Sequence, residues 1–119
     1  MEIGYPRSMN LYKCSLRFST LVLNWTIKYR NEIGEAEFLK IRKMVMQIPK
    51  NIASAIVDIH IKNKYKKLNH AKETFLLLTS SLRNLGMETS EKHLVVLSLE
   101  LLKLINGYFG YLGKKKNAK

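Results

Sequence analysis

The sequence predicts an all-α fold: an antiparallel four-helix bundle with a kink at Pro49 in the second helix. Apolar residues recur at steps of three and four along most of the chain, which is the spacing of amphipathic helices. No short run alternates apolar and polar residues between turn signals, as a strand would. Short polar or glycine-containing breaks divide the pattern into four segments, and short connections favour antiparallel neighbours.

The first segment predicts a helix over residues 8–29, followed by a break at 31–34. Its expected inner stripe follows the steps 3, 4, 3, 4 and consists of Leu11, Cys14, Phe18, Leu21 and Trp25.

The second segment predicts one helix over residues 35–61. Its expected stripe consists of Phe38, Ile41, Val45, Ile48, Ile52, Ile56 and Ile59. The stripe keeps its phase through Pro49, although a proline removes one backbone hydrogen bond. The pattern therefore favours one kinked helix over two separate helices.

A polar connection is expected at residues 62–67, and the third helix over 67–85. Gly86 occupies the position of a left-handed C-terminal cap. Thr89 or Ser90 is expected to cap the fourth helix, which continues to about Leu112. The expected inner stripes consist of Leu68, Ala71, Phe75, Leu78, Leu82 and Leu85, and of Leu94, Leu97, Leu101, Ile105, Tyr108 and Leu112.

The length of 119 residues fits a single domain over 1–112, followed by a basic flexible tail at 113–119. A Rossmann-type fold or a barrel enzyme needs more chain. No unbroken apolar run approaches the ~20 residues of a membrane span, so no membrane partner is expected. One cysteine and no signal-peptide pattern favour a cytoplasmic protein.

The residue types that carry catalysis are sparse, so we expect no enzyme, no cofactor and no metal. His60, His70 and His93 show no i, i+4 pair, and no Glu-x-x-His motif occurs. Cys14 lies on an inner stripe and reads as a small buried hydrophobe. Surface or cap positions are the simpler interpretation of the histidines.

The charge predicts a polyanionic partner, because 21 Lys and Arg residues stand against 9 Asp and Glu, a net charge of +12. The densest patch surrounds the second connection, where His60, His70 and Tyr65 accompany several lysines. Another lies on the outer face of the second helix, which has no acid between Phe38 and Val57. The candidate nucleic-acid-binding residues of these patches, the fourth helix and the tail are Lys40, Arg42, Lys43, Lys50, Lys62, Lys64, Lys66, Lys67, Lys72, Lys103, Lys114, Lys115 and Lys116.

Each patch also has a plainer interpretation. A lysine-rich connection can be a solvated turn, and every soluble helix needs a polar outer face. On the fourth helix, Gly107 and Gly110 share a side with Lys103 and Lys114, which suits either an anionic partner or close helix packing.

The fourth helix carries more apolar surface than one core needs. A second stripe lies beside the inner one, and helices that are apolar over most of their circumference are normally covered on two sides. We therefore expect self-association through Val95, Leu99, Leu102 and Phe109.

The stretch 38–53, with Ile48, Pro49, Asn51, Ile52 and Ala53 at its centre, resembles the second-helix signature of bacterial four-helix-bundle proteins encoded in intervening sequences of large-subunit ribosomal RNA. The second half is similar to the accessory variability proteins of diversity-generating retroelements. The similarity lies in the basic connection, in residues 82–86, and in the glycine-containing aromatic end of the fourth helix with its following lysines.

The resemblance covers residues 35–116 and implies a homopentameric ring with a basic surface. In the retroelement group it implies binding to a reverse transcriptase and its RNA template, for mutagenic copying into DNA. The leading hypothesis is thus a non-catalytic, oligomeric accessory protein of a reverse transcriptase that binds RNA, DNA or both. The alternatives are a protein–protein adaptor and a ribosomal-RNA intervening-sequence protein with no direct nucleic-acid role; a membrane-surface protein fits less well.

Overall fold

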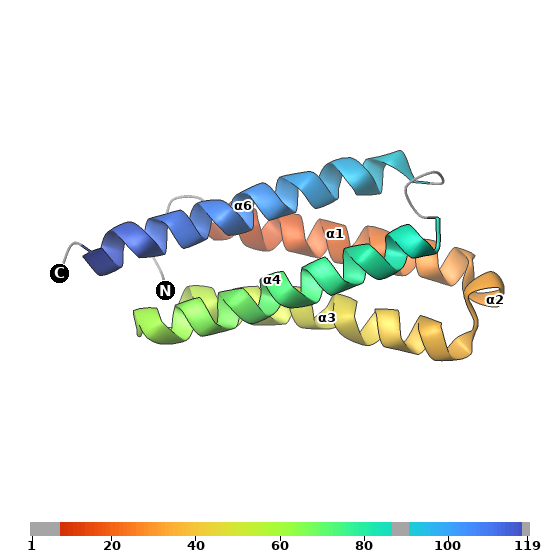
Figure 1. Cartoon of the computed structure of the whole chain (residues 1–119), viewed down its shortest axis with the longest axis horizontal. Coiled ribbons are helices and arrows are strands. Elements are labelled where there is room, and N and C mark those ends of the chain that lie inside the picture. The colour runs from red at the N-terminus through yellow and green to blue at the C-terminus, as the bar shows by residue number, and fades with distance from the viewer. Residues whose placement is uncertain (1–7, 87–90, 118–119) are drawn as a thin grey trace.

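The computed structural model is all-α and describes residues 8–86 and 91–117 (Figure 1). Within these residues it contains five helices and no strand. The helices are α1 (Ser8–Lys28), α2 (Arg30–Ile33), α3 (Glu35–Val57), α4 (Ile61–Asn84) and α6 (Lys92–Asn117).

The four long helices lie side by side in an elongated molecule of 52 × 24 × 21 Å, and consecutive long helices run in opposite directions (Figure 1). Contacts connect α1 with α3, α3 with α4, α4 with α6, and α6 back to α1. Among these pairs α3 and α4 have the most extensive contact, whereas α4 and α6 have the least. The positions of α3 and α4 relative to each other are therefore the most strongly fixed by packing. The helices α4 and α6 pack over a smaller area.

The expected inner faces form the core almost throughout. One continuous cluster contains most residues of the four long stripes, among them Phe18, Ile48, Phe75 and Leu101. Leu85, expected on the inner stripe of α4, is 38% exposed because it lies beyond the last residue of that helix, so that prediction is wrong. In α1 the prediction shifts by one position, since Val22 is buried and Leu21 is only half-buried. Burial of these side chains removes apolar surface from water and supplies the main favourable term for folding.

The second helix ends earlier than predicted. α3 stops at Val57, where Asp58 takes an extended conformation. Ile59, expected on the inner stripe, is therefore 85% exposed, and that prediction is wrong. Near this end Ala55 occupies the core, and Ile56 is half-buried beside it.

Two segments expected to be irregular are helical. Residues 62–67 belong to the first turns of α4, which begins at Ile61, so the lysines of the expected connection lie on a helix. The expected tail is helical as far as Asn117, because α6 continues through Gly113. The expected caps Thr89 and Ser90 lie outside the described residues. Gly86 has a φ of 82°, which confirms the left-handed cap after α4.

Pro49 lies inside α3, which continues through it as one helix, as the unbroken stripe predicts. Proline has no N–H, so the carbonyl oxygen of Val45, four residues earlier, loses its helical donor. The hydroxyl of Ser19 on α1 donates a hydrogen bond to that oxygen at 3.1 Å, and Ser19 is buried. A neighbouring helix thus satisfies the acceptor that the proline leaves open.

Candidate nucleic-acid interface

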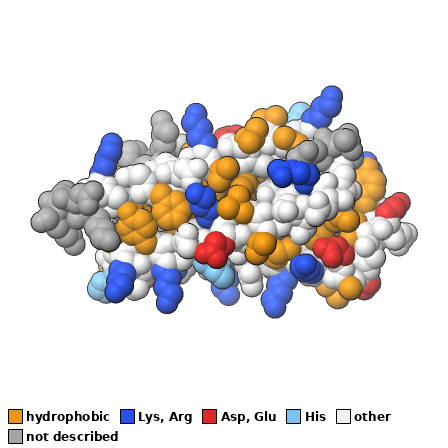
Figure 2. Space-filling model, viewed as in Figure 1, with side chains coloured by type: hydrophobic (Ala, Val, Ile, Leu, Met, Phe, Trp, Pro, Cys, Tyr) orange, Lys and Arg blue, Asp and Glu red, His pale blue; other side chains and the backbone are white. Residues whose placement is uncertain are grey.

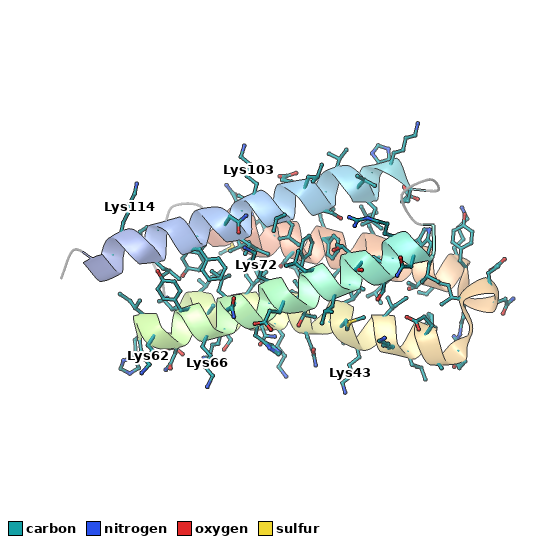
Figure 3. All side chains as sticks on the ribbon, in the orientation of Figure 1. Lys43, Lys62, Lys66, Lys72, Lys103 and Lys114 are labelled. Carbon is teal, nitrogen blue, oxygen red and sulfur yellow. The ribbon has the colours of Figure 1, made fainter. Side chains whose placement is uncertain are left out.

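Exposed cations follow one long edge of the molecule, which we call the α3–α4 edge. Lys43, Lys62 and Lys66 point outward along it (Figure 3). Helical spacing places two more exposed lysines of α3 on the face of Lys43. The α3–α4 edge therefore consists of Lys40, Lys43, Lys50, Lys62 and Lys66. Arg42, which is also exposed, flanks it.

Two acids close to this pair of helices interact with side chains of α4. Asp58 forms an ion pair with Lys67 at 2.6 Å, and Glu73 accepts a hydrogen bond from the Asn69 amide at 2.7 Å. Within the described parts of the chain, the five lysines of the α3–α4 edge form no ion pair. Their positive charge is consequently not neutralised internally and is available to an anion.

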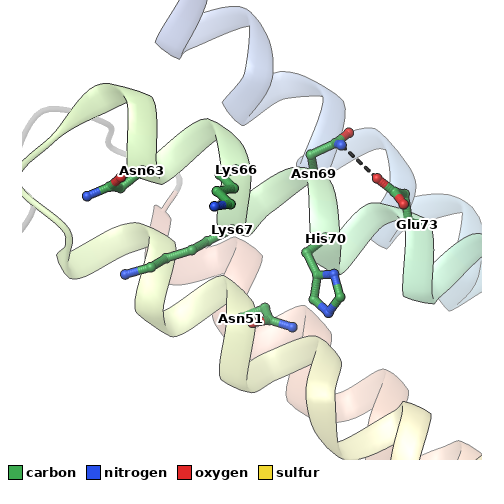
Figure 4. A pocket seen from close by; sticks show the side chains of 7 residues that line it. All are labelled: Asn51, Asn63, Lys66, Lys67, Asn69, His70 and Glu73. Carbon is green, nitrogen blue, oxygen red and sulfur yellow. Dashed lines mark hydrogen bonds between the residues drawn. The ribbon is translucent and has the colours of Figure 1, made fainter.

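A polar groove of about 570 Å³ adjoins this edge, because Lys66 belongs to its lining (Figure 4). Asn51 of α3 lies on one side and residues of α4 lie on the other (Figure 4). The α4 residues that line this groove are Asn63, Lys66, Lys67, Asn69, His70 and Glu73. The α3–α4 edge thus continues into a groove rich in hydrogen-bonding groups.

Lys64 does not belong to this surface, and its prediction as a phosphate ligand is wrong for this fold. Its side chain is 5% exposed. The ammonium donates hydrogen bonds to the carbonyl oxygens of Ala55 at 3.1 Å and Ile56 at 2.7 Å, with the Tyr108 hydroxyl at 3.4 Å. These carbonyls belong to the last turn of α3, where helical donors run out and the helix dipole attracts a cation.

Lys67 and Lys72 are also partly committed to the fold. The hydrogen bond from Lys67, with another from the His60 backbone N–H, lowers the pKa of Asp58 to about 2. Lys72 donates a hydrogen bond to the Asn106 side chain at 2.8 Å, and its ammonium lies 5.6 Å from the centre of the Phe109 ring. Both lysines still border the solvent, but each has an internal role.

The remaining predicted cations lie elsewhere. Lys103 and Lys114 point away from α6 on the opposite long edge, while Lys72 lies between α4 and α6 (Figure 3). Lys115 stacks over the Tyr111 ring at 5.6 Å. The side chain of Lys116 lies outside the described residues. The structure therefore separates the predicted set into two edges instead of gathering it in one site.

The second stripe of α6 borders the contact between α4 and α6, which we call the α4–α6 seam. Its members Val95, Leu102 and Phe109 are half-buried against the core, and Phe109 packs on Tyr65 with ring centres 6.0 Å apart. Leu99 is 65% exposed. Hydrophobic side chains lie along the middle of this face with some charged side chains among them, and further Lys and Arg side chains project at both long edges (Figure 2). Three members of the second stripe are thus partly covered within the chain, and Leu99 is not.

The groove contains residues that were not among the predicted ligands: Asn51, Asn63, Asn69, His70 and Glu73. The sequence does contain a pattern that indicates some of the groove residues. Asn63, Lys66, His70 and Glu73 recur at steps of 3, 4 and 3, which is one face of a helix. The face was missed because residues 62–67 were interpreted as a connection. Asn51 gave no separate signal, since it reaches the groove from another helix.

Cys14 and the candidate metal ligands can be placed only for the described part of the chain. Cys14 is buried, and burial, with a smaller effect of Glu100, raises the pKa of its thiol to about 11. Among the described residues no three His, Cys, Asp or Glu side chains cluster as a metal site requires.

By length and composition, α6 would be able to cross a membrane over Lys92–Lys115, and 28% of the tested window is buried. The expectation from unbroken apolar runs missed this property because charged residues such as Lys103 interrupt the run. Core helices of water-soluble proteins meet the same criteria, so length and composition do not distinguish the two cases.

Comparisons with protein-family models, with curated proteins and with solved structures find no match to this chain. The resemblance to intervening-sequence and retroelement proteins therefore stays a prediction.

Proposed function

We propose that this protein is a non-catalytic nucleic-acid-binding accessory protein that contacts phosphates through the α3–α4 edge. The observation that carries the proposal is the row of exposed lysines at this edge, which form no ion pair within the described residues. Lys43, Lys62 and Lys66 come from two helices whose mutual contact is the most extensive in the fold. Such a row would present several positive charges at fixed spacing.

The proposed mechanism is neutralisation of phosphates by lysine ammonium groups. Each phosphate contact releases counterions, so the affinity falls with salt, with a slope of about −0.7 per contact for single strands. Phosphate contacts position a nucleic acid but carry no sequence information. Binding through the α3–α4 edge alone would therefore be strongly salt-dependent and weakly sequence-dependent.

The decisive experiment compares two double variants with equal charge change. Lys62→Glu with Lys66→Glu alters the α3–α4 edge, and Lys103→Glu with Lys114→Glu alters the opposite edge. We expect the first pair to lower affinity for RNA more than tenfold in filter binding at moderate salt, and the second pair to have a smaller effect. The reverse order would move the interface to α6, and a wild-type protein that retains no RNA or DNA at low salt would refute the proposal.

The same proposal includes the bundle architecture and the self-association of the protein. We take α1, α3, α4 and α6 to form an antiparallel four-helix bundle with a kink at Pro49, which their cyclic contacts support. Self-association, for which the resemblance implies a pentamer, would multiply weak phosphate contacts. The exposed Leu99 supports a contact at the second stripe. A wild-type monomer at tens of micromolar in sedimentation would exclude self-association under those conditions.

A reverse transcriptase as the partner rests on the resemblance alone. A neighbouring reverse-transcriptase gene with a template repeat would support it, and a position inside a ribosomal RNA operon would favour the intervening-sequence group.

The alternative function is a protein–protein adaptor. The observation that favours it is the exposed apolar surface of α4 and α6, where Leu77, Val96 and Leu99 are each at least 64% exposed. An adaptor would bind an acidic protein partner and retain no RNA in the same filter assay.

A further inference from the structure

We propose that the polar groove between α3 and α4 holds one unstacked nucleotide of a single strand and favours a base that carries an exocyclic amino group. This inference rests on the proposed nucleic-acid binding and adds the recognition of a base to the contact with phosphates. The groove volume of about 570 Å³ lies within the range of small-molecule sites.

The first argument is the carboxylate in a basic surface. Glu73 lines the same groove as Lys66 and Lys67. A surface that contacts only phosphates gains nothing from a carboxylate, because the two anions repel each other. A carboxylate does accept hydrogen bonds from the amino group of a base, as Glu and Asp do with cytosine N4.

The second argument is the arrangement around Glu73. The Asn69 amide donates one hydrogen to Glu73 Oε1 at 2.7 Å, which orients its NH₂ group beside the carboxylate. The second hydrogen of that NH₂ group is not needed for this bond. The pair therefore presents a donor next to an acceptor. Cytosine offers the complement, an N3 acceptor next to an N4 amino donor, whereas uracil places a carbonyl oxygen where the amino group would be.

The third argument is the opposite side of the groove. Asn51 extends from α3 toward His70 of α4 (Figure 4). Asn51 is half-buried, and it lines the groove. His70 is exposed, so one face of its imidazole ring is available to stack on a base. An amide and a ring facing each other fit a flat ligand with polar edges.

The phosphate of the same nucleotide has a cation within reach. Lys66 lines the groove, is exposed and forms no ion pair within the described residues, whereas Lys67 is held by Asp58. Lys66 is thus the link between the groove and the α3–α4 edge. A base inside a duplex keeps its pairing edge occupied, so this arrangement requires an unpaired nucleotide.

The test measures binding of the full chain to three fluorescent RNAs, C12, U12 and a 12-base-pair duplex, by anisotropy at one salt concentration. We expect C12 to bind about fivefold to tenfold more tightly than U12. We also expect C12 to bind at least as tightly as the duplex. A surface that contacts phosphates alone would prefer the duplex, which has the higher charge density.

Glu73→Gln separates base recognition from charge. It removes one negative charge, so simple electrostatics predicts tighter binding of all three RNAs. Base recognition predicts instead that the ratio of U12 to C12 dissociation constants falls toward one. The matched control is Glu100→Gln, which makes the same charge change at an exposed position of α6. We expect this control to leave the ratio unchanged, and Asn51→Ala to reduce it, with circular dichroism verifying the helix content.

Equal affinities of the wild-type protein for C12 and U12, or a duplex that binds more tightly than C12, would overturn the groove assignment while the phosphate contact stands. A ratio that Glu73→Gln leaves intact would do the same. If none of the RNAs binds at low salt, the proposed function itself fails.

Discussion

The middle and the C-terminal end of α3 both contain carbonyl oxygens that lack a helical donor, and the fold satisfies them in different ways. In the middle, Pro49 leaves the Val45 oxygen open, and the neutral hydroxyl of Ser19 on α1 donates to it. At the end, the charged ammonium of Lys64 on α4 donates to Ala55 and Ile56.

The difference follows from the electrostatics of a helix. A single open carbonyl in the interior is a local defect that one hydroxyl can satisfy. At the C-terminus several carbonyls point the same way and carry a partial negative charge, which favours a cation. The comparison teaches that a lysine in a basic protein can be part of the backbone's hydrogen-bonding scheme, so charge alone does not assign it to a ligand.

The largest effect is expected for Lys64→Met, which keeps the apolar length of the side chain and removes its ammonium. Two carbonyl oxygens, one buried and one half-buried, would lose this donor, so we expect the free energy of unfolding to fall by about 2–3 kcal/mol in urea denaturation. The matched control is Lys66→Met, two residues along the same helix but exposed, with an expected change within about 0.5 kcal/mol. Equal effects of both substitutions would contradict the cap assigned to Lys64.

A smaller effect is expected for Ser19→Ala, which removes the donor to the Val45 oxygen and should cost about 1 kcal/mol. Pro49→Ala restores a backbone N–H at position 49, so Ser19→Ala should cost little in that background. A double-mutant cycle followed by urea denaturation measures this coupling. Additive effects of the two substitutions would show that the hydroxyl does not compensate for the proline.

The smallest effect is expected at acidic pH. It concerns Asp58, which follows the last residue of α3. The pKa of Asp58 is about 2 in the fold, below its ordinary value of 3.8, because Lys67 and the His60 N–H donate to its carboxylate. A lowered pKa stabilises the fold above about pH 4, and this contribution is lost as the pH falls toward 2. Asp58→Asn should therefore lose less stability than the wild-type protein between pH 5 and pH 2.5 in thermal melts. An identical pH dependence of both proteins would contradict the ion pair.

Most of the core was predictable because hydrophobic periodicity is a local property of the chain. The stripes of Phe38 to Ile52 and Leu68 to Leu82 lie in the core as expected. The ends of helices were harder to predict. Ile59 continues the pattern of α3 but lies beyond its last residue, since the chain turns at Asp58 so that α4 can start at Ile61.

The candidate site was predictable only in part. The charge pattern correctly marked Lys62 and Lys66 as exposed cations, but the same pattern included the buried Lys64. The groove needs Asn51 from α3 opposite His70 from α4, and no spacing within one helix reveals a pair of residues from two helices.

By itself, the sequence determined that this protein is helical and which face of each long helix is buried, because both depend on the order of apolar and polar residues along the chain. Only the tertiary structure decided which lysines serve the fold and which face the solvent. The ammonium of Lys64 is buried because the last carbonyls of α3 lie beside it, and that neighbourhood exists only once the two helices have packed.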